Sequence, residues 1–381
     1  MKILMVAIPN HHFFRWVNQL QDSGFEVFWF DVSSNGTNSP QIPWVTQHVD
    51  WKLKWDYPFR FKLKKHLPKL YNKIQKINEV HVENAFNKFL NANKPDIIHC
   101  FEMKLSGIPI LETLLNHNNI PLIYSSWGSD LFYFEHLQVQ KTQVETFLNR
   151  VNYLITDCER DYNIAKQNGF SHTFLGVLPG NGGLEIQPKH IKPTQNRDTI
   201  LIKGYDDGVG KAIEVLKAIE HIPIELIKPF KIVVYSADDV VVNYIKLSQF
   251  YNRIEVETFS RYSFVKNEKI LKLMGQSALH IANSISDGMP NALLEAMAMG
   301  VFPIQSNPGK VTEEVVTHNK NGFLIENPLD VEHISAVIKQ ALLNELLRES
   351  AQDYNVNFMA KNYKRSTLQP KIVTLYNTVL K

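Results

Sequence analysis

The sequence is poor in cysteine and in long apolar runs. Its two cysteines, Cys100 and Cys158, lie far apart and lack metal-ligand spacing, which favours a reducing compartment over a disulfide framework. No stretch approaches the roughly 18–20 apolar residues of a membrane span. The first residues, MKILMVAIPN, contain too short an apolar run for a signal peptide. We therefore expect a cytoplasmic protein and leave open a peripheral attachment to the inner face of the cell membrane.

Excess charge and metal-binding motifs are also scarce. The formal net charge is only +3 over 381 residues, so no overall electrostatic field attracts nucleic acid, and no nucleic-acid-binding motif is present. No Asp-x-Asp motif ends a predicted strand, and the fourteen histidines show no HxxxH or HExxH spacing. The sequence therefore predicts no nucleic-acid partner, no metal and no other cofactor.

Short apolar runs alternate with helical patterns along both halves of the chain. This alternation is typical of a doubly wound, mainly parallel α/β sheet. It is interrupted by a polar stretch with prolines, 187–198, and restarts with the apolar run TILIK. One long helical stretch is predicted from about Lys69 to Asn93. The predicted organisation is an N-terminal domain over 1–180, a linker over 181–198 and a C-terminal domain over 199–364.

The most informative stretch is SISDGMPNALLEAMAMGVFPIQSNPG, from Ser284 to Gly309. Asp287 and Glu295 are separated by seven residues; a Gly-Met-Pro turn follows the first, and the second lies one turn into a strong helix former. The N-terminus of that helix presents unpaired backbone N–H groups and the positive end of the helix dipole. Such a site can hold a phosphate and hydrogen-bond neighbouring hydroxyls, which together are the features of a sugar nucleotide.

This stretch resembles the nucleotide-sugar site of the family-4 retaining glycosyltransferases, which have the GT-B fold. Asp287 stands where the family has glutamate, whereas the Gly-x-Pro, Leu-Leu-Glu-Ala-Met-Ala and Gly-x-x-Pro-Ile elements match. The resemblance implies two Rossmann-like domains facing across a cleft, with a last helix, about 365–381, returning to the first domain. It also implies a donor-binding set made of Lys203, Gly204, Lys211, Asp287, Gly288, Met289, Pro290, Asn291, Leu294 and Glu295.

The resemblance further implies roles for some of these side chains. Glu295 would bind the ribose hydroxyls, and Asp287 would contact the donor sugar. Lys203 and Lys211 would stabilise the departing diphosphate in place of a metal. The candidate catalytic residues are Asp287, Lys211 and Asp130. The alternative for the two lysines is that they are solvated surface residues.

Two loops of the N-terminal half carry the remaining candidates. In SSWGSDLFYF, Trp127 stands where the family often has the histidine of His-Gly-x-Asp, and Asp130 matches the aspartate. A turn or N-cap role for Asp130 remains an equal alternative. The loop IPNHHFF after the first strand lacks the glycines usual in the family. His11, His12 and Trp127 are therefore candidates for the acceptor side, against the alternative that the histidines are partly exposed loop residues.

The stretch 51–77 interleaves basic and aromatic residues, with nine Lys or Arg against one acid, Asp56. A surface of this kind suits anionic lipid head groups or a lipid-linked acceptor. The alternative is a solvated helix face with snorkelling lysines.

This resemblance therefore implies a retaining, metal-independent, hexosyltransferase-like enzyme. It would move a sugar from a nucleotide donor to a hydroxyl of a glycan or lipid-linked acceptor, in assembly of a bacterial capsule, lipopolysaccharide or exopolysaccharide. Two alternatives remain open. One is a GT-B sugar-nucleotide epimerase, and the other is a catalytically inactive membrane-binding relative, because Asp287, Trp127 and the first loop depart from the family pattern.

Overall fold

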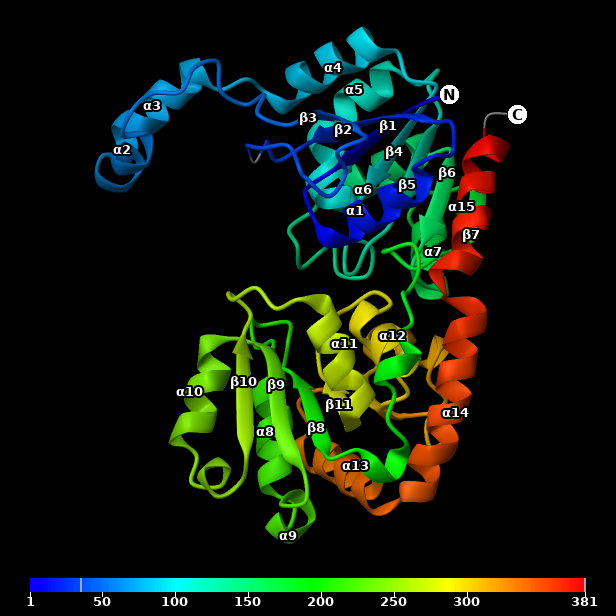
Figure 1. Cartoon of the computed structure of the whole chain (residues 1–381). Coiled ribbons are helices and arrows are strands. Elements are labelled where there is room, and N and C mark those ends of the chain that lie inside the picture. Colours follow the sequence, from blue (N-terminus) through cyan, green and yellow to red (C-terminus); the bar gives the residue numbers. More distant parts are fainter. Residues whose placement is uncertain (35, 380–381) are drawn as a thin grey trace. The chain divides into compact units, whose positions relative to one another are not determined.

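The computed structural model describes residues 1–34 and 36–379, which form two compact units, each built around one parallel sheet (Figure 1). The first unit contains Met1–Asp157, Asp161–Gly182 and the chain from Lys371 onward. The second contains Cys158–Arg160 and Gly183–Pro370.

The first unit is a seven-stranded sheet in the order β3-β2-β1-β4-β5-β6-β7. One face packs on α4, α5 and α6 through a core that includes Phe86, Leu114 and Phe147. On the other face, Trp16 of α1 packs on the ring of His99 from β4. The strands are β1 (Lys2–Ala7), β2 (Glu26–Asp31), β3 (Thr46–His48), β4 (Ile97–Phe101), β5 (Leu122–Ser125), β6 (Tyr153–Thr156) and β7 (Thr173–Val177). The helices are α1 (His11–Val17), α2 (Arg60–His66), α3 (Pro68–Asn78), α4 (Val82–Asn93), α5 (Leu111–Asn116), α6 (Lys141–Arg150) and α7 (Glu159–Gln167), of which the first two residues belong to the second unit.

The second unit is a six-stranded sheet in the order β10-β9-β8-β11-β12-β13. Helices α8, α10 and α13 cover one face with residues such as Leu216, Val241 and Ile338. Helices α11 and α12 cover the other face through Met274 and Ala296. The strands are β8 (Thr199–Lys203), β9 (Lys231–Ala237), β10 (Val256–Ser260), β11 (Ser277–Ala282), β12 (Phe302–Ser306) and β13 (Phe323–Ile325). The helices are α8 (Ala212–Glu220), α9 (Ile224–Ile227), α10 (Asp239–Leu247), α11 (Asn267–Gln276), α12 (Asn291–Ala298), α13 (Val331–Leu343) and α14 (Glu345–Asn362).

The last helix, α15 (Arg365–Val379), joins the first unit through its C-terminal part. The hydroxyl of Tyr376 accepts a hydrogen bond from Trp16 Nε1 at 2.9 Å and lies 2.6 Å from His99 Nδ1. His99 Nε2 lies 2.8 Å from the Ser125 hydroxyl. A buried polar chain thus ties this helix to α1 and to strands β4 and β5. The predicted helix 365–381 is described up to residue 379, and its last two residues lie outside the described part.

The predicted helix from Lys69 to Asn93 is two helices, α3 and α4, separated by extended residues. Asn78 explains the break. Its side chain accepts from Trp55 N at 3.0 Å and donates to Trp55 O at 2.9 Å. In addition, Val80 N donates to Lys52 O. Lys54 N also donates to Asn78 O, so residues 52–55 take two backbone groups, Asn78 O and Val80 N, that a continuing helix would have used.

The predicted linker over 181–198 packs on the second unit from Gly183 onward. Arg197 is buried and donates to the carbonyls of Lys192, Ser277 and Met299 at 2.9–3.1 Å. The Thr194 hydroxyl donates to Gln352 Oε1 at 2.7 Å. The Arg197 side chain thus satisfies backbone carbonyl groups near the amino ends of the strands of the second unit.

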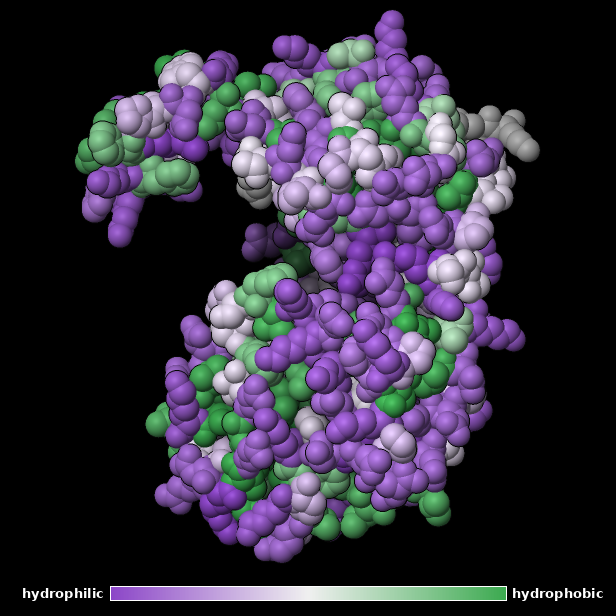
Figure 2. Space-filling view, in the orientation of Figure 1, coloured by the Kyte–Doolittle hydropathy of each residue, from purple (hydrophilic) through white to green (hydrophobic). Residues whose placement is uncertain are grey.

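Helices α2 and α3 form an arm that projects from the rest of the first unit (Figure 1). We use the name arm for residues 51–78. Helix α2 buries none of its residues, and α3 buries only Gln75 and Asn78. Hydrophobic and hydrophilic side chains lie next to each other on its surface (Figure 2). Within residues 1–34 and 36–379, none of the helices combines the length and apolarity required to cross a bilayer.

Candidate functional site

The central strands of the second unit bring several predicted residues to one sheet edge. Strands β8 and β11 are neighbours, and the strand order reverses between them. In open parallel sheets, ligands bind at the carboxyl ends of the strands at such a switch point. Lys203 is the last residue of β8, and the loop with Asp287 follows β11.

The loop from Gly204 to Lys211 is held tightly against this edge. A Cβ on Gly204 would lie 2.6 Å from Ala237 Cα, so only glycine allows the approach of β9. Asp206 accepts from Ile213 N at 2.8 Å, and Asp207 accepts from Gly210 N at 3.0 Å. Lys211 precedes α8, and its backbone N donates to Asn283 O at 2.9 Å. The carboxylates therefore fix the loop that carries the second candidate lysine.

Asp287 lies partly buried before α12. Burial raises the pKa of its carboxyl above 3.8, while the charges of Lys203 and Arg160 act in the opposite direction. Arg160 also donates to the Asp287 carbonyl at 2.8 Å and to the Pro308 carbonyl at 2.9 Å. Reasoning from the sequence missed Arg160, because no local motif marks an arginine that acts 127 positions away.

Glu295 lies in the second turn of α12, half-buried. Its Oε1 accepts a hydrogen bond from Asn267 Nδ2 at 3.3 Å, which links it to the first residue of α11. Burial, and to a lesser extent the charge of Glu295, raises the pKa of Tyr235 well above its usual range. The Tyr235 hydroxyl lies 2.9 Å from His280 Nε2. Tyr235 of β9 and His280 of β11 therefore form a buried polar pair close to the Glu295 carboxylate.

The other residues predicted to bind the sugar nucleotide lie in the turn before α12 or in the helix itself. Pro290 is the N-cap residue of α12, and Asn291 begins the helix, half-buried. Gly288 and Met289 are buried in the turn before them. Met289 and Leu294 belong to a hydrophobic cluster, so their side chains support the helix by packing.

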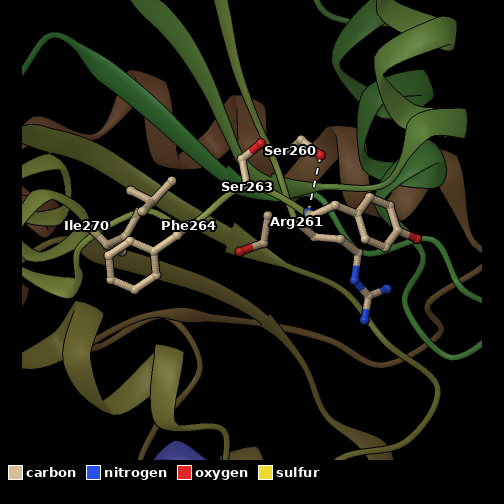
Figure 3. A pocket seen from close by; sticks show the side chains of 8 residues that line it. Ser260, Arg261, Ser263, Phe264 and Ile270 are labelled. Atoms are coloured by element: carbon tan, nitrogen blue, oxygen red, sulfur yellow. Dashed lines mark hydrogen bonds between the residues drawn. The ribbon is translucent and has the colours of Figure 1, made fainter. Parts of the chain in front are cut away.

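A recess of about 260 Å³ lies beside this edge, after strands β9 and β10. Phe264 and Ile270 lie together on one side of it, and the Arg261 guanidinium is directed to the other side (Figure 3). Phe264 is 90% exposed. The remaining lining residues are Ser236, Ser260, Tyr262, Ser263 and Val265.

In the first unit, the structure brings His12 and Trp127 together. Their rings meet edge to face, with centroids 6.2 Å apart, and Trp127 also packs on Phe101 at 5.2 Å. His11 and His12 do not lie in a loop as predicted. They form the first turn of α1, because the Asn10 side chain caps that helix by accepting from Phe13 N at 2.8 Å. His11 is exposed and His12 half-buried.

Asp130 is buried and its carboxylate accepts three hydrogen bonds. They come from Met103 N at 2.9 Å, the Tyr124 hydroxyl at 2.5 Å and Trp127 N at 3.2 Å. Burial, followed by the nearby Glu102 carboxyl, raises the pKa of Asp130 well above its usual range. These contacts hold the loop that carries Trp127. A catalytic role for Asp130 stays a prediction.

Two parallel α/β units, the second with cations and carboxylates at its switch point, are the architecture of the GT-B glycosyltransferases. The family described as Glycosyl transferases group 1 matches residues 186–358, and the family described as Glycosyl transferase 4-like matches residues 2–158. The chain therefore belongs to the group 1, family-4-like glycosyltransferases. A comparison with curated proteins finds no significant match.

Solved structures share the fold over the whole chain. Sucrose-phosphate synthase from Thermosynechococcus elongatus has a TM-score of 0.71 at 16% identity, covering 100% of this chain and 99% of its own. HepE from Anabaena in complex with UDP has a TM-score of 0.70 at 14% identity, covering 99% and 100%. A glycosyltransferase from Rickettsia africae has a TM-score of 0.67 at 14% identity, covering 100% and 98%.

Proposed function

We propose that this chain is a retaining glycosyltransferase that moves a hexosyl group from a nucleotide sugar to a hydroxyl acceptor without a metal. The observation that supports this function is the convergence of Lys203, Asp287 and the N-terminus of α12 at one sheet edge. A sugar nucleotide needs a cation for its diphosphate, carboxylates for its hydroxyls and N–H groups for its anionic oxygens. This edge offers all three.

Each group has a physical task in this proposal. Departure of the nucleoside diphosphate concentrates negative charge on its oxygens. The Lys203 ammonium and the positive end of α12 stabilise that charge most when it is largest, which lowers the barrier. Asp287 accepts hydrogen bonds from the sugar and Glu295 from the ribose. Lys211 supplies a second cation, which makes a divalent metal unnecessary.

The recess beside Phe264 is proposed to take the nucleobase. The segment that forms it leads directly into α11, whose first residue, Asn267, donates to Glu295. The base would therefore lie next to the carboxylate proposed for the ribose. An exposed aromatic ring suits stacking on the flat face of a base.

Binding and product analysis test this function. The purified protein is screened by thermal shift against UDP-, GDP-, ADP- and CMP-sugars, and the best donor is then followed in the presence of simple glycan acceptors. UDP-glucose heads the panel because structures of HepE were solved with UDP-glucose and with UDP and glucose. Net transfer with the donor's anomeric configuration in the product is expected. Isomerised donor would instead show an epimerase, and the absence of any donor-dependent stabilisation would show an inactive relative.

The place of this activity is proposed to be bacterial surface glycan assembly on a membrane, with the arm as the contact. Phe59 and Phe61 are 71% and 75% exposed on the arm, and Lys62, Lys64 and Lys65 are exposed beside them. Aromatic rings suit the interface of a bilayer, and each basic residue near an anionic surface contributes about 1 kcal/mol.

Co-sedimentation with phosphatidylglycerol vesicles tests the arm. Binding should rise with anionic lipid content and fall with salt, because salt screens the attraction. Reversal of Lys62, Lys64 and Lys65 to Glu should abolish it. The matched control reverses three exposed lysines of the second unit, Lys228, Lys246 and Lys339, and should bind like the wild type. A wild-type protein that ignores these vesicles at low salt would indicate a soluble acceptor instead.

A further inference from the structure

The ring of Tyr205 contacts two cations. Lys203 Nζ lies 4.6 Å from the ring centroid, and Arg261 Cζ lies 4.1 Å from it. Tyr205 follows Gly204 in the loop after β8, whereas Arg261 follows β10. The side chains of two separate segments therefore meet at one aromatic ring beside the proposed donor site.

Arg261 is itself held by two carboxylates. Its Nη1 donates to Asp207 Oδ2 at 3.0 Å and to both oxygens of Asp238 at 3.0 and 3.1 Å. Asp238 is buried and also accepts from Asp206 N at 2.8 Å. Because these bonds fix the guanidinium and the loop together, the Tyr205 ring lies on a rigid support. The two acids also balance the charge of Arg261, which lowers its repulsion of Lys203.

A lysine on a flexible stem gains from such a support. Ordering a long side chain on ligand binding costs rotamer entropy, and a side chain that is already restrained loses less. Attraction to the face of the ring restrains the Lys203 ammonium. Lys203 also acts on Asp287, whose carboxyl pKa it lowers against the larger effect of burial. The ammonium is thus kept near the carboxylate proposed to meet the donor sugar.

We propose that Tyr205 is a positioning residue that orients Lys203 toward the diphosphate of the donor, with Arg261, Asp207 and Asp238 holding the ring in place. This inference rests on the proposed function, since it gives Lys203 the diphosphate as its ligand. Tyr205 contributes its ring, so its hydroxyl is dispensable.

Substitution of the ring separates this role from loop packing. Loss of one cation–π contact should weaken binding of a nucleoside diphosphate by roughly 2- to 30-fold in Tyr205→Leu. The free nucleoside, which lacks phosphates, should bind Tyr205→Leu as it binds the wild type. Tyr205→Phe keeps the ring and should restore the diphosphate affinity. A residue that merely supports the loop would change both ligands together.

Calorimetry with UDP, GDP and ADP, each beside its nucleoside, measures these affinities. A cycle with Lys203→Met then tests the mechanism: Tyr205→Leu should cost little further affinity once the ammonium is gone. If the wild type binds a diphosphate, two results would overturn the positioning role. One is that the affinity losses of Tyr205→Leu and Lys203→Met add in the double variant, and the other is that Tyr205→Leu and Tyr205→Phe lose the same affinity. Failure of the wild type to bind any of the three diphosphates would overturn the proposed function itself.

Discussion

Replacement of Arg160 by methionine should weaken binding of the sugar nucleotide, although Arg160 lies outside the motif predicted to bind it. Its guanidinium donates to the carbonyls of Asp287 and Pro308 at 2.8 and 2.9 Å, and so joins two loops at the carboxyl edge of the second unit. Methionine keeps much of the side-chain volume but removes both donors. The turn before α12 would then lose its support.

The expected magnitude follows from these two bonds. A hydrogen bond from a charged donor contributes about 1.5–3 kcal/mol, and the lower value applies because Arg160 is only half-buried. Both bonds together then give about 3 kcal/mol of lost loop stability. If about half of that must be restored when the donor binds, the donor Kd rises by roughly tenfold. Loss of the arginine charge also removes one of the influences that lower the Asp287 pKa. The acidic limb of the donor-binding pH profile should therefore move to higher pH.

Isothermal titration calorimetry across pH, with unfolding followed by circular dichroism, measures both effects. Arg197→Lys is the matched control, because Arg197 also donates to backbone carbonyls in the second unit but at the amino ends of the strands. It should lower the stability and leave the donor Kd unchanged. Equal affinity of Arg160→Met and the wild type at every pH would refute the reasoning.

Three further predictions concern the site and the C-terminal helix. Glu295→Gln should weaken nucleoside diphosphate binding by about tenfold or more, since each charge-assisted hydrogen bond contributes about 1.5–3 kcal/mol; unchanged affinity in calorimetry would remove it from the site. Transfer should survive EDTA; loss of activity on chelation that magnesium restores would contradict the metal-free mechanism. Lys211→Ala should lower kcat and leave the melting temperature nearly unchanged, because a partly exposed lysine contributes little to stability. Tyr376→Phe should lower the unfolding free energy by about 1–3 kcal/mol for each partner it abandons, Trp16 Nε1 and His99 Nδ1. Burial lowers the pKa of His99 well below 6.5. As pH falls below 6.5, the unfolded chain protonates His99 before the folded protein does, so the stability that the buried neutral His99 contributes is present above pH 6.5 and is lost below it. Urea titrations at pH 7.5 and 5.5 measure the effect of Tyr376→Phe and this loss of stability.

Local patterns in the sequence predicted the parts of this protein whose cause is local. Alternating apolar runs predicted parallel strands because a strand buried on both faces must be apolar along its length. The stretch NALLEAMAM predicted α12, which spans Asn291–Ala298. Its spacing also predicted that Asp287 and Glu295 would flank one helix N-terminus. Family membership follows from this same ordered stretch together with the strand–helix order.

Only the tertiary structure decided which distant side chains meet. Arg160 reaches the Asp287 loop, Arg261 reaches Tyr205, and Asn78 binds the Trp55 backbone and so divides a predicted helix. Propensity and periodicity extend over a few residues, whereas these contacts depend on how separate elements pack and on which buried polar groups then need partners. The sequence by itself therefore determined the fold class and the donor motif. The packing of strands and loops decided which further residues orient that motif.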